Sequence, residues 1–267
     1  MPPGIEEAAV SGTPLVVAET EGFAVLFKPP GIHCAPLRPD DRDTLLHRYA
    51  RIFPPVMELR GRKEREGGLI HRLDFDTGGL VLVAKNRKSL DSLTEQQAAG
   101  NFVKEYGAIC RKAADLPCGF PPEPAQFRGR DCATFVGLAM ESFFRPFGPG
   151  RKQVRPAVDS ARRETARDRG DFYRTEILGV TKSADTSSGH CRFAVRLKRG
   201  FRHQVRCHLA WIGHPILNDP LYGIRISLPH SRLALRAEAL FFADPESGRP
   251  LEYRIPPLEL PPDSGYN

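Results

Sequence analysis

The stretch that decides the fold is residues 68–84, which read GLIHRLDFDTGGLVLVA. Apolar residues at both ends, 68–70 and 80–84, predict two strands joined by a polar loop over residues 71–79. A side chain at a strand end stands on a rigid frame, which suits a reactive carboxylate such as Asp74. Asp, Thr and Gly are also ordinary turn formers. On residue type alone, the turn interpretation is favoured.

On both sides of this loop, the hydrophobic pattern predicts more strands than helices. Residues 117–170 are predicted as a basic, loop-rich segment. We expect a hairpin over 14–28, a helix over 88–99 capped by Ser89, a second helix over 203–211, and further strands over 102–110, 172–180, 191–197, 233–242 and 251–255. Recurrent hairpins favour the α+β class, with a mixed, mostly antiparallel central sheet flanked by helices and loops.

The length of 267 residues corresponds to about 1.8 average domains. Because the chain shows no internal repeat and no low-complexity linker, we expect a single domain over residues 14–257, with tails at 1–13 and 258–267. The N-terminus lacks the basic and apolar segments of a signal peptide. Apolar runs reach only five residues, such as 80–84, against the roughly 20 that a membrane span needs. We therefore expect a cytoplasmic protein.

Composition narrows the partners and the metal chemistry. The 39 Lys and Arg residues against 32 Asp and Glu give a net charge of +7, so polyanions are the expected partners. The six cysteines are far apart in the sequence, without a CxxC pair, and they predict reduced thiols rather than disulfides or a zinc ribbon. They are Cys34, Cys110, Cys118, Cys132, Cys191 and Cys207. Neither a Walker A loop nor a GxGxxG loop occurs, so no nucleotide cofactor is expected.

Positive charge is concentrated over residues 192–206, which hold six Lys or Arg residues and no acid. In a strand over 191–197, Arg192 and Arg196 share one face while Phe193 and Val195 share the other. A solvated face and a phosphate-binding face explain this pattern equally well.

Two further arrangements were weighed as catalytic sites. Asp74 and Asp76 would lie on one side of a strand, about 6–7 Å apart, which does not exclude a glycosidase pair. His203 and His208 are not neighbours on a helix, so a two-histidine metal site is disfavoured. Tyr106 shares a strand face with Lys104, and a strand tyrosine is usually a core residue.

Four segments follow one another in a recognisable order. They are FKPPG at 27–31, HRLDFDTGGL at 71–80, KEY at 104–106 and HQVRCHL at 203–209, the last continued by GHPILNDPLYG at 213–223. In this order they resemble the motifs of the RluA-type RNA pseudouridine synthases. The resemblance covers nearly the whole chain. It departs from the family where Gly78 replaces a serine, where one arginine before His203 is displaced by a position, and where the S4-type RNA-binding module of many relatives is not expected.

The resemblance implies a single pseudouridine-synthase-like domain that isomerises specific uridines in structured rRNA or tRNA without a cofactor or metal. Asp74 would be the catalytic carboxylate, either attacking the sugar or assisting glycosidic cleavage, with Arg206 as its basic partner. Tyr106 would stack on the flipped base and serve in proton transfer. The implied RNA-binding residues are Arg72, Lys104, Arg202, His203 and Gln204, and the resemblance implies a monomer.

The resemblance also weighs on the alternatives. Asp76 matches no catalytic position of the family, which demotes the glycosidase pair. A non-catalytic RNA-binding protein that keeps the scaffold is the main rival. A pure binder has no use for a carboxylate aimed at polyanionic RNA, so the presence of Asp74, Tyr106 and Arg206 argues against it.

Overall fold

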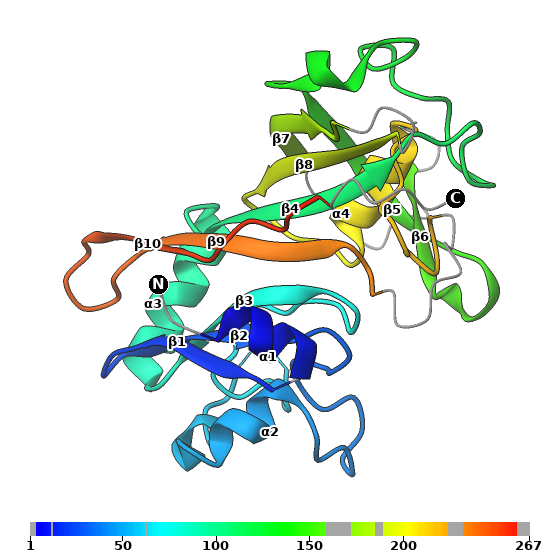
Figure 1. The fold of residues 1–267 in the computed structure, drawn as a ribbon. Coiled ribbons are helices and arrows are strands. Elements are labelled where there is room, and N and C mark those ends of the chain that lie inside the picture. Colours follow the sequence, from blue (N-terminus) through cyan, green and yellow to red (C-terminus); the bar gives the residue numbers. More distant parts are fainter. Residues whose placement is uncertain are drawn as a thin grey trace. The chain divides into compact units, whose positions relative to one another are not determined.

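The computed structural model describes residues 4–11, 13–61, 63–158, 172–184, 189–223 and 232–260 (Figure 1). The chain divides into two compact units. The first unit comprises Met1–Lys104 and Arg236–Pro256, and the second comprises Glu105–Leu235 and Pro257–Asn267. Among the described residues, no helix is long and apolar enough to cross a membrane.

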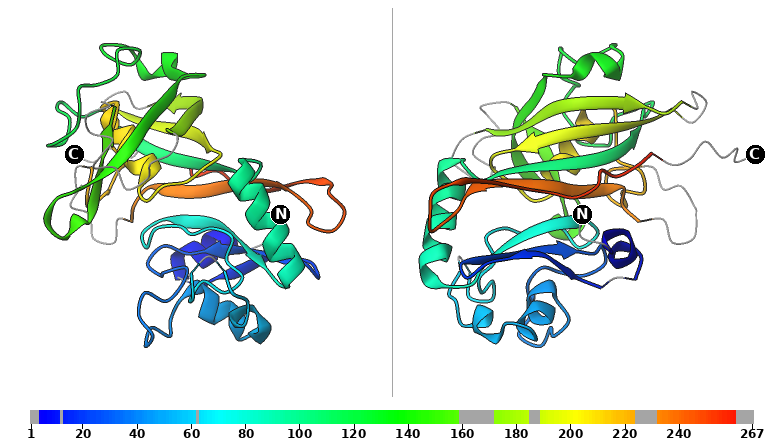
Figure 2. Two further views of the ribbon diagram at one scale, coloured as in Figure 1. Left: turned by 180° about the vertical axis from the view of Figure 1, so that it is seen from behind. Right: turned by 60° about the vertical axis from the view of Figure 1, so that its left-hand side comes forward.

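The first unit contains a sheet with strand order β1-β2-β3-β9, and β10 also pairs with β9. Its strands are β1 (Leu15–Glu19), β2 (Phe23–Lys28), β3 (Gly78–Ala84), β9 (Leu235–Ala243) and β10 (Pro250–Arg254). β3 pairs with β9 in parallel, whereas the β1–β2, β2–β3 and β9–β10 pairs are antiparallel. Figure 2 shows β9 and β10, orange to red, as a long hairpin. The helices are α1 (Ile5–Ser11), α2 (Leu45–Ala50), the 3-10 helix η1 (Pro54–Met57) and α3 (Arg87–Ala99).

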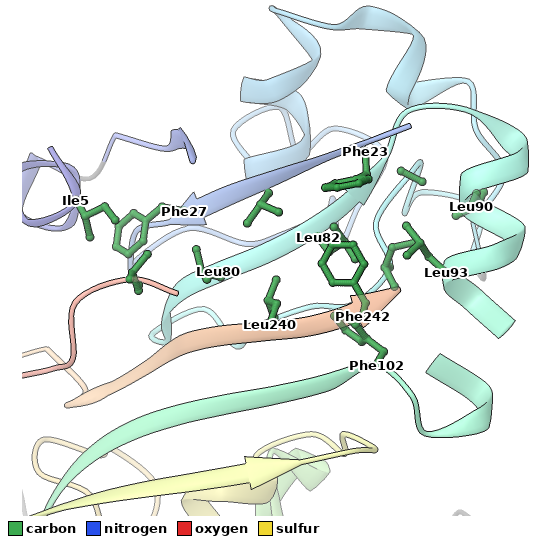
Figure 3. Packing of buried hydrophobic residues seen from close by; sticks show 14 of the residues in the cluster. Ile5, Phe23, Phe27, Leu80, Leu82, Leu90, Leu93, Phe102, Leu240 and Phe242 are labelled. Carbon is green, nitrogen blue, oxygen red and sulfur yellow. The ribbon is translucent and has the colours of Figure 1, made fainter. Parts of the chain in front are cut away.

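The core of the first unit forms where β2, β3, β9 and α3 contribute apolar side chains (Figure 3). All six residues of β2 and all seven of β3 are buried, which explains the apolar runs at residues 23–27 and 80–84. Phe23 packs edge-on against Phe242 at a ring distance of 5.2 Å. This packing holds β3, and therefore the loop that precedes it, on a rigid base.

The second unit contains a sheet with strand order β4-β8-β7-β5-β6. Its elements are β4 (Val103–Arg111, which begins in the first unit), β5 (Ala139–Phe147), β6 (Gln153–Ala157), β7 (Tyr173–Lys182), β8 (His190–Leu197), α4 (Gln204–Trp211) and the 3-10 helices η2 (Cys132–Phe135) and η3 (Pro149–Arg151). The β5–β6, β5–β7 and β7–β8 pairs are antiparallel. Phe144 on β5 and Cys207 on α4 belong to the same buried cluster.

The mixed, mostly antiparallel α+β architecture is confirmed, and so are the hairpin over 14–28 and the final strand pair. The strand predicted over residues 68–70 is wrong, because only an isolated bridge joins Leu69 to Val83. The backbone of Gly68 approaches Ala84 so closely that a Cβ would lie 2.1 Å from the Ala84 carbonyl oxygen. The division into domains at 14 and 257 remains a prediction, although α1 lies inside the predicted N-terminal tail.

Three further differences concern local signals. Residues 117–170 are not only loop, because β5 and β6 lie within them, while residues 159–170 are outside the described part of the chain. The cap of α3 is Asn86, whose side chain accepts a hydrogen bond from the Ser89 amide at 2.8 Å, rather than Ser89 itself. The short helices α1 and α2 were not predicted, because six or seven residues are too few for a clear helical period.

Candidate active site

The loop over residues 71–77 joins the bridge at Leu69 to β3 and carries Arg72 and Asp74. Three backbone contacts determine its shape. The amide of Gly31 donates to the carbonyl of Phe75 at 2.9 Å, the amide of Thr77 donates to the carbonyl of Asp74 at 3.1 Å, and the amide of Leu73 donates to Cys34 Sγ at 3.2 Å. The half-buried Asp74 therefore stands on a braced loop.

The buried cation of Lys28 contacts the backbone of the same loop. Lys28, the last residue of β2, is fully buried, and its Nζ donates to the carbonyls of Pro29 and Ile32 at 2.9 Å and of Phe75 at 3.1 Å. Burial lowers the pKa of Lys28 to about 8, and the charges of Asp74 and Asp76 oppose part of that shift, whereas burial raises the pKa of the Cys34 thiol. Lys28 is therefore mostly protonated at pH 7.

His71 anchors the beginning of the loop. Its Nε2 accepts a hydrogen bond from the Leu82 amide at 3.2 Å, and its ring packs against Phe102 at 5.1 Å. Burial, and then the charge of Lys104, hold the pKa of His71 well below its ordinary value. A neutral His71 is therefore a structural part of the loop rather than a second charged group beside Asp74.

Arg72 points outward from the same loop. Its guanidinium contacts Glu66 at 2.8 Å, and its side chain is 47% exposed. The neighbouring Phe75 is also exposed, with its ring 4.8 Å from the ring of His33. A cation and an aromatic ring therefore flank Asp74 at the surface, and both can contact a nucleic acid.

Residues 104–106 lie at the start of β4, and both predicted side chains are buried. Lys104 is 4% exposed, its Nζ lies 5.5 Å from the centre of the Phe102 ring, and burial lowers its pKa to about 8. Tyr106 is 7% exposed. Lys104 has little surface to offer RNA in this arrangement, and its predicted RNA contact remains a prediction.

Arg206, in the first turn of α4, contacts Asp219 through two hydrogen bonds of 2.8 Å, from Nε to Oδ2 and from Nη2 to Oδ1. Both side chains are buried, with exposed fractions of 2% and 0%. Asp219 Oδ1 also accepts from the amides of Leu221 and Tyr222, so the carboxylate is itself positioned by its own loop. The sequence analysis did not single out Asp219, although this residue lies in the segment 213–223 that resembles the family and was therefore a usable signal.

Arg202, His203 and Gln204, at the start of α4, differ in their surroundings. Gln204 is buried, donates to the Arg174 carbonyl and to Thr175 Oγ1 at 3.0 Å, and accepts from the Phe201 amide. These contacts use its amide inside the unit, so they do not support the predicted RNA contact. Arg202 is exposed and donates to the Arg151 carbonyl at 2.7 Å.

His203 caps α4 with a φ of +59°, a left-handed conformation that a non-glycine residue adopts at a cost. Its Nδ1 lies 3.1 Å from the hydroxyl of Tyr222, and that hydroxyl also accepts from the Val154 amide. The backbone turn at His203 therefore fixes where α4 begins.

The basic segment 192–206 alternates on β8 as expected, with Phe193 and Val195 buried and the arginines half-buried. Arg196 contacts Glu105 at 2.7 Å, and Arg192 donates to the carbonyl of Leu258 at 2.8 Å. The exposed cations are therefore Lys198, Arg199 and Arg202, at the turn that leads into α4.

The predicted catalytic residues are thus divided between the two units. The first unit holds Asp74 with Arg72 and Lys28, and the second holds Tyr106 on β4 and Arg206 with Asp219 on and beside α4. The chemistry that these groups can supply consists of a carboxylate, a phenol and a buried guanidinium.

Comparison with known proteins supplies the deciding observation. A family model described as RNA pseudouridylate synthase matches residues 22–211. This chain belongs to that family. It is 34% identical over 242 residues to an uncharacterized RNA pseudouridine synthase of Chloroflexus aurantiacus, covering 88% of this chain and 62% of the relative. It is 27% identical over 263 residues to the ribosomal large subunit pseudouridine synthase D of Xanthomonas campestris, covering 93% of this chain and 68% of the relative.

The fold agrees with this membership of the synthase family. The human RNA pseudouridylate synthase domain containing 1 matches 94% of this chain and 86% of its own, with a TM-score of 0.65 and 20% identity. The human RNA pseudouridylate synthase domain containing 4 matches 94% of this chain and 90% of its own, with a TM-score of 0.60 and 16% identity. This chain thus spans about two thirds of the length of the relatives it matches by sequence and most of these two structures.

Proposed function

We propose that this chain converts uridine to pseudouridine in structured RNA. In this reaction the bond between ribose C1′ and uracil N1 breaks, and a bond between C1′ and C5 forms. The hydrogen at C5 leaves as a proton, and N1 takes up a proton, so the reaction needs no redox partner. Membership of the synthase family is the observation that carries the proposal. We also propose that the reaction needs no cofactor.

Asp74 is the proposed catalytic residue, acting at the sugar as nucleophile or as aid to cleavage. The bracing of its loop by Lys28, Gly31 and Cys34 supports this role, because a reactive carboxylate must be held in place before the substrate arrives.

We propose that Tyr106 and Arg206 also take part in the reaction. Tyr106 would stack on the uracil ring and take part in proton transfer. Arg206 would be the basic partner of the reaction. The paired contact with Asp219 supports a positioning role for that carboxylate, because two hydrogen bonds fix the plane of the guanidinium.

A uridine in a stem must leave the base stack to reach such residues, at a cost of a few kcal/mol. We propose that Arg72 occupies the vacated space, since its exposed guanidinium stands two residues from Asp74 on the same loop. Lys198, Arg199 and Arg202 would contact backbone phosphates, and affinity should therefore fall steeply with salt.

Large-subunit ribosomal RNA is the first substrate to test, because several relatives are named as ribosomal large subunit synthases. Transfer RNA is the second substrate to test. The predicted cytoplasmic location and monomeric state rest on the sequence and stay predictions.

The decisive experiment compares Asp74→Asn with the matched variant Asp76→Asn, which changes the same residue type in the same loop. Large-subunit rRNA transcribed with uridine tritiated at C5 is incubated with each protein, and tritium release is counted. We expect release with the wild type and with Asp76→Asn, and loss of at least about 1,000-fold with Asp74→Asn, because the reacting group is removed. Binding of the RNA should survive in both variants.

Two results would contradict the proposal. Full tritium release by a pure Asp74→Asn preparation would remove Asp74 from the chemistry. Tight binding of rRNA and tRNA by the wild type, without tritium release from either, would instead favour the non-catalytic RNA-binding protein.

A further inference from the structure

Three side chains with sulfur or nitrogen ligands meet inside the second unit, outside the proposed catalytic groups. Cys132 begins η2, Cys191 lies on β8, and His214 lies in the loop after α4. Their ligand atoms all lie within 4.8 Å of one another. All three side chains are buried, with exposed fractions of 7%, 2% and 4%.

We propose that Cys132, Cys191 and His214 bind a structural zinc ion. The distance from Cys191 Sγ to His214 Nδ1 is 3.7 Å. A tetrahedral zinc ion with ordinary bond lengths of about 2.3 Å to sulfur and 2.0–2.1 Å to nitrogen separates two such ligands by about 3.6 Å. The two atoms therefore already stand at the separation that zinc requires.

Charge and ligand type favour the same ion. Two thiolates and a neutral imidazole around Zn²⁺ carry no net charge, so the complex can be buried without an isolated ionic charge. Thiolate and imidazole ligands in a tetrahedral set select zinc over magnesium or calcium, which prefer oxygen. The three side chains supply three of the four tetrahedral positions, and a water molecule would take the fourth.

The ligands are held before any metal arrives. The side chain of Asp131 caps η2 by accepting from the Ala133 amide at 2.9 Å, which orients the turn that carries Cys132. The rings of Phe135 and Phe193 pack against the imidazole of His214 at 5.7 and 5.3 Å. Such supporting contacts are typical of a metal site in which the ligands are oriented by their neighbours.

A buried cysteine often acts only as a small apolar residue. Cys207 fits that description, because it is buried in α4 and its thiol donates to the carbonyl of Val154. Cys191 likewise donates to a carbonyl, that of Cys110 at 3.7 Å, but Cys191 and Cys132 also lie close to each other and to the imidazole of His214. The bound ion would tie η2, within the long segment that follows β4, to β8 and to the loop after α4.

The test measures zinc in the full-length protein. The wild type is purified with reductant, dialysed against metal-free buffer and analysed by mass spectrometry of its metal content, before and after stripping and reloading with zinc chloride. We expect about one zinc per chain, and less than one tenth of that in Cys132→Ser, Cys191→Ser and His214→Ala. Cys207→Ser is the matched control, a buried cysteine of the same unit, and should keep the full amount.

Cobalt loading provides an independent readout that does not depend on the variants folding. The stripped wild type titrated with Co²⁺ should show thiolate-to-cobalt charge-transfer absorption and the intense visible bands of a tetrahedral site. A wild type that takes up neither zinc nor cobalt would overturn the proposal. So would full zinc in a folded Cys191→Ser variant, or a Cys132–Cys191 disulfide in place of metal. None of these results depends on the pseudouridine synthase activity.

Discussion

At the scale of single residues, the chemistry depends on how charges are paired inside the protein. Arg206 and Asp219 are both buried and meet in a two-point contact. Lys28 is buried with three backbone carbonyls around its Nζ. Each buried charge is therefore compensated, and its orientation is determined by more than one contact. Exposed pairs such as Arg174 with Glu141 lack this environment.

Asp219→Ala should be far more damaging than the loss of an exposed carboxylate. The substitution leaves the Arg206 guanidinium buried without its carboxylate, which destabilises a fold by about 3–5 kcal/mol. Glu141→Ala, the control, breaks an exposed pair and should cost less than about 1 kcal/mol. Urea unfolding of both variants measures the difference, and equal losses would show that the buried pair has no special weight.

At the scale of elements, the parallel pairing of β3 with β9 sets the position of the loop that carries Asp74. The register joins Gly78 to Arg236 and Gly79 to Ala237, directly after that loop. Gly79 has a φ of +125°, and a Cβ on it would lie 2.3 Å from the Ala237 carbonyl oxygen. Only glycine satisfies both the conformation and the close approach.

Gly79→Ala should therefore prevent folding or lower the free energy of unfolding by more than about 3 kcal/mol, because the new methyl group meets backbone rather than a movable side chain. The matched control is Gly179→Ala on β7, where a Cβ would meet only Ala194 Cβ at 3.9 Å. Thermal unfolding followed by circular dichroism compares the two. A Gly79→Ala protein as stable as the control would argue against the β3–β9 pairing.

The elements also show how far local patterns carry. β2, β3, β7, β8 and α4 follow from apolar runs and alternation within a few residues. The strand expected at residues 68–70 is reduced to the bridge between Leu69 and Val83, and the preceding Gly67 has a φ of +50° that no strand residue adopts. β5 and β6 were missed because four prolines and glycines at their junction, from Pro146 to Gly150, concealed a hairpin.

At the scale of the whole molecule, the stability of the fold is linked to pH through buried histidines. His208 on α4 is fully buried, with Nε2 3.0 Å from Ser142 Oγ and Nδ1 2.8 Å from Thr175 Oγ1. Burial lowers its pKa from 6.5 to about 3. His208 therefore binds a proton near pH 6.5 in the unfolded chain but only near pH 3 in the folded chain.

Stability should therefore fall as the pH is lowered through this window, because protons bind the unfolded state preferentially. His208 alone would contribute a loss of roughly 3 kcal/mol between pH 6.5 and pH 4. Urea unfolding at several pH values measures the slope. His208→Gln removes the titrating group, so the total loss between pH 6.5 and pH 4 should be smaller in this variant by roughly 3 kcal/mol. Identical slopes would contradict the burial of a neutral His208.

The sequence by itself determined the α+β class, the polar loop between apolar segments and the ordered motifs that mark the synthase family. These properties depend on residues close together in the chain, where alternation and motif spacing are visible. Only the tertiary structure decided that Arg206 contacts Asp219, that Lys28 supports Phe75, that Gln204 is turned inward, and that Cys132, Cys191 and His214 meet. The physical reason is that side-chain partners are chosen by packing between distant segments, which no local spacing specifies.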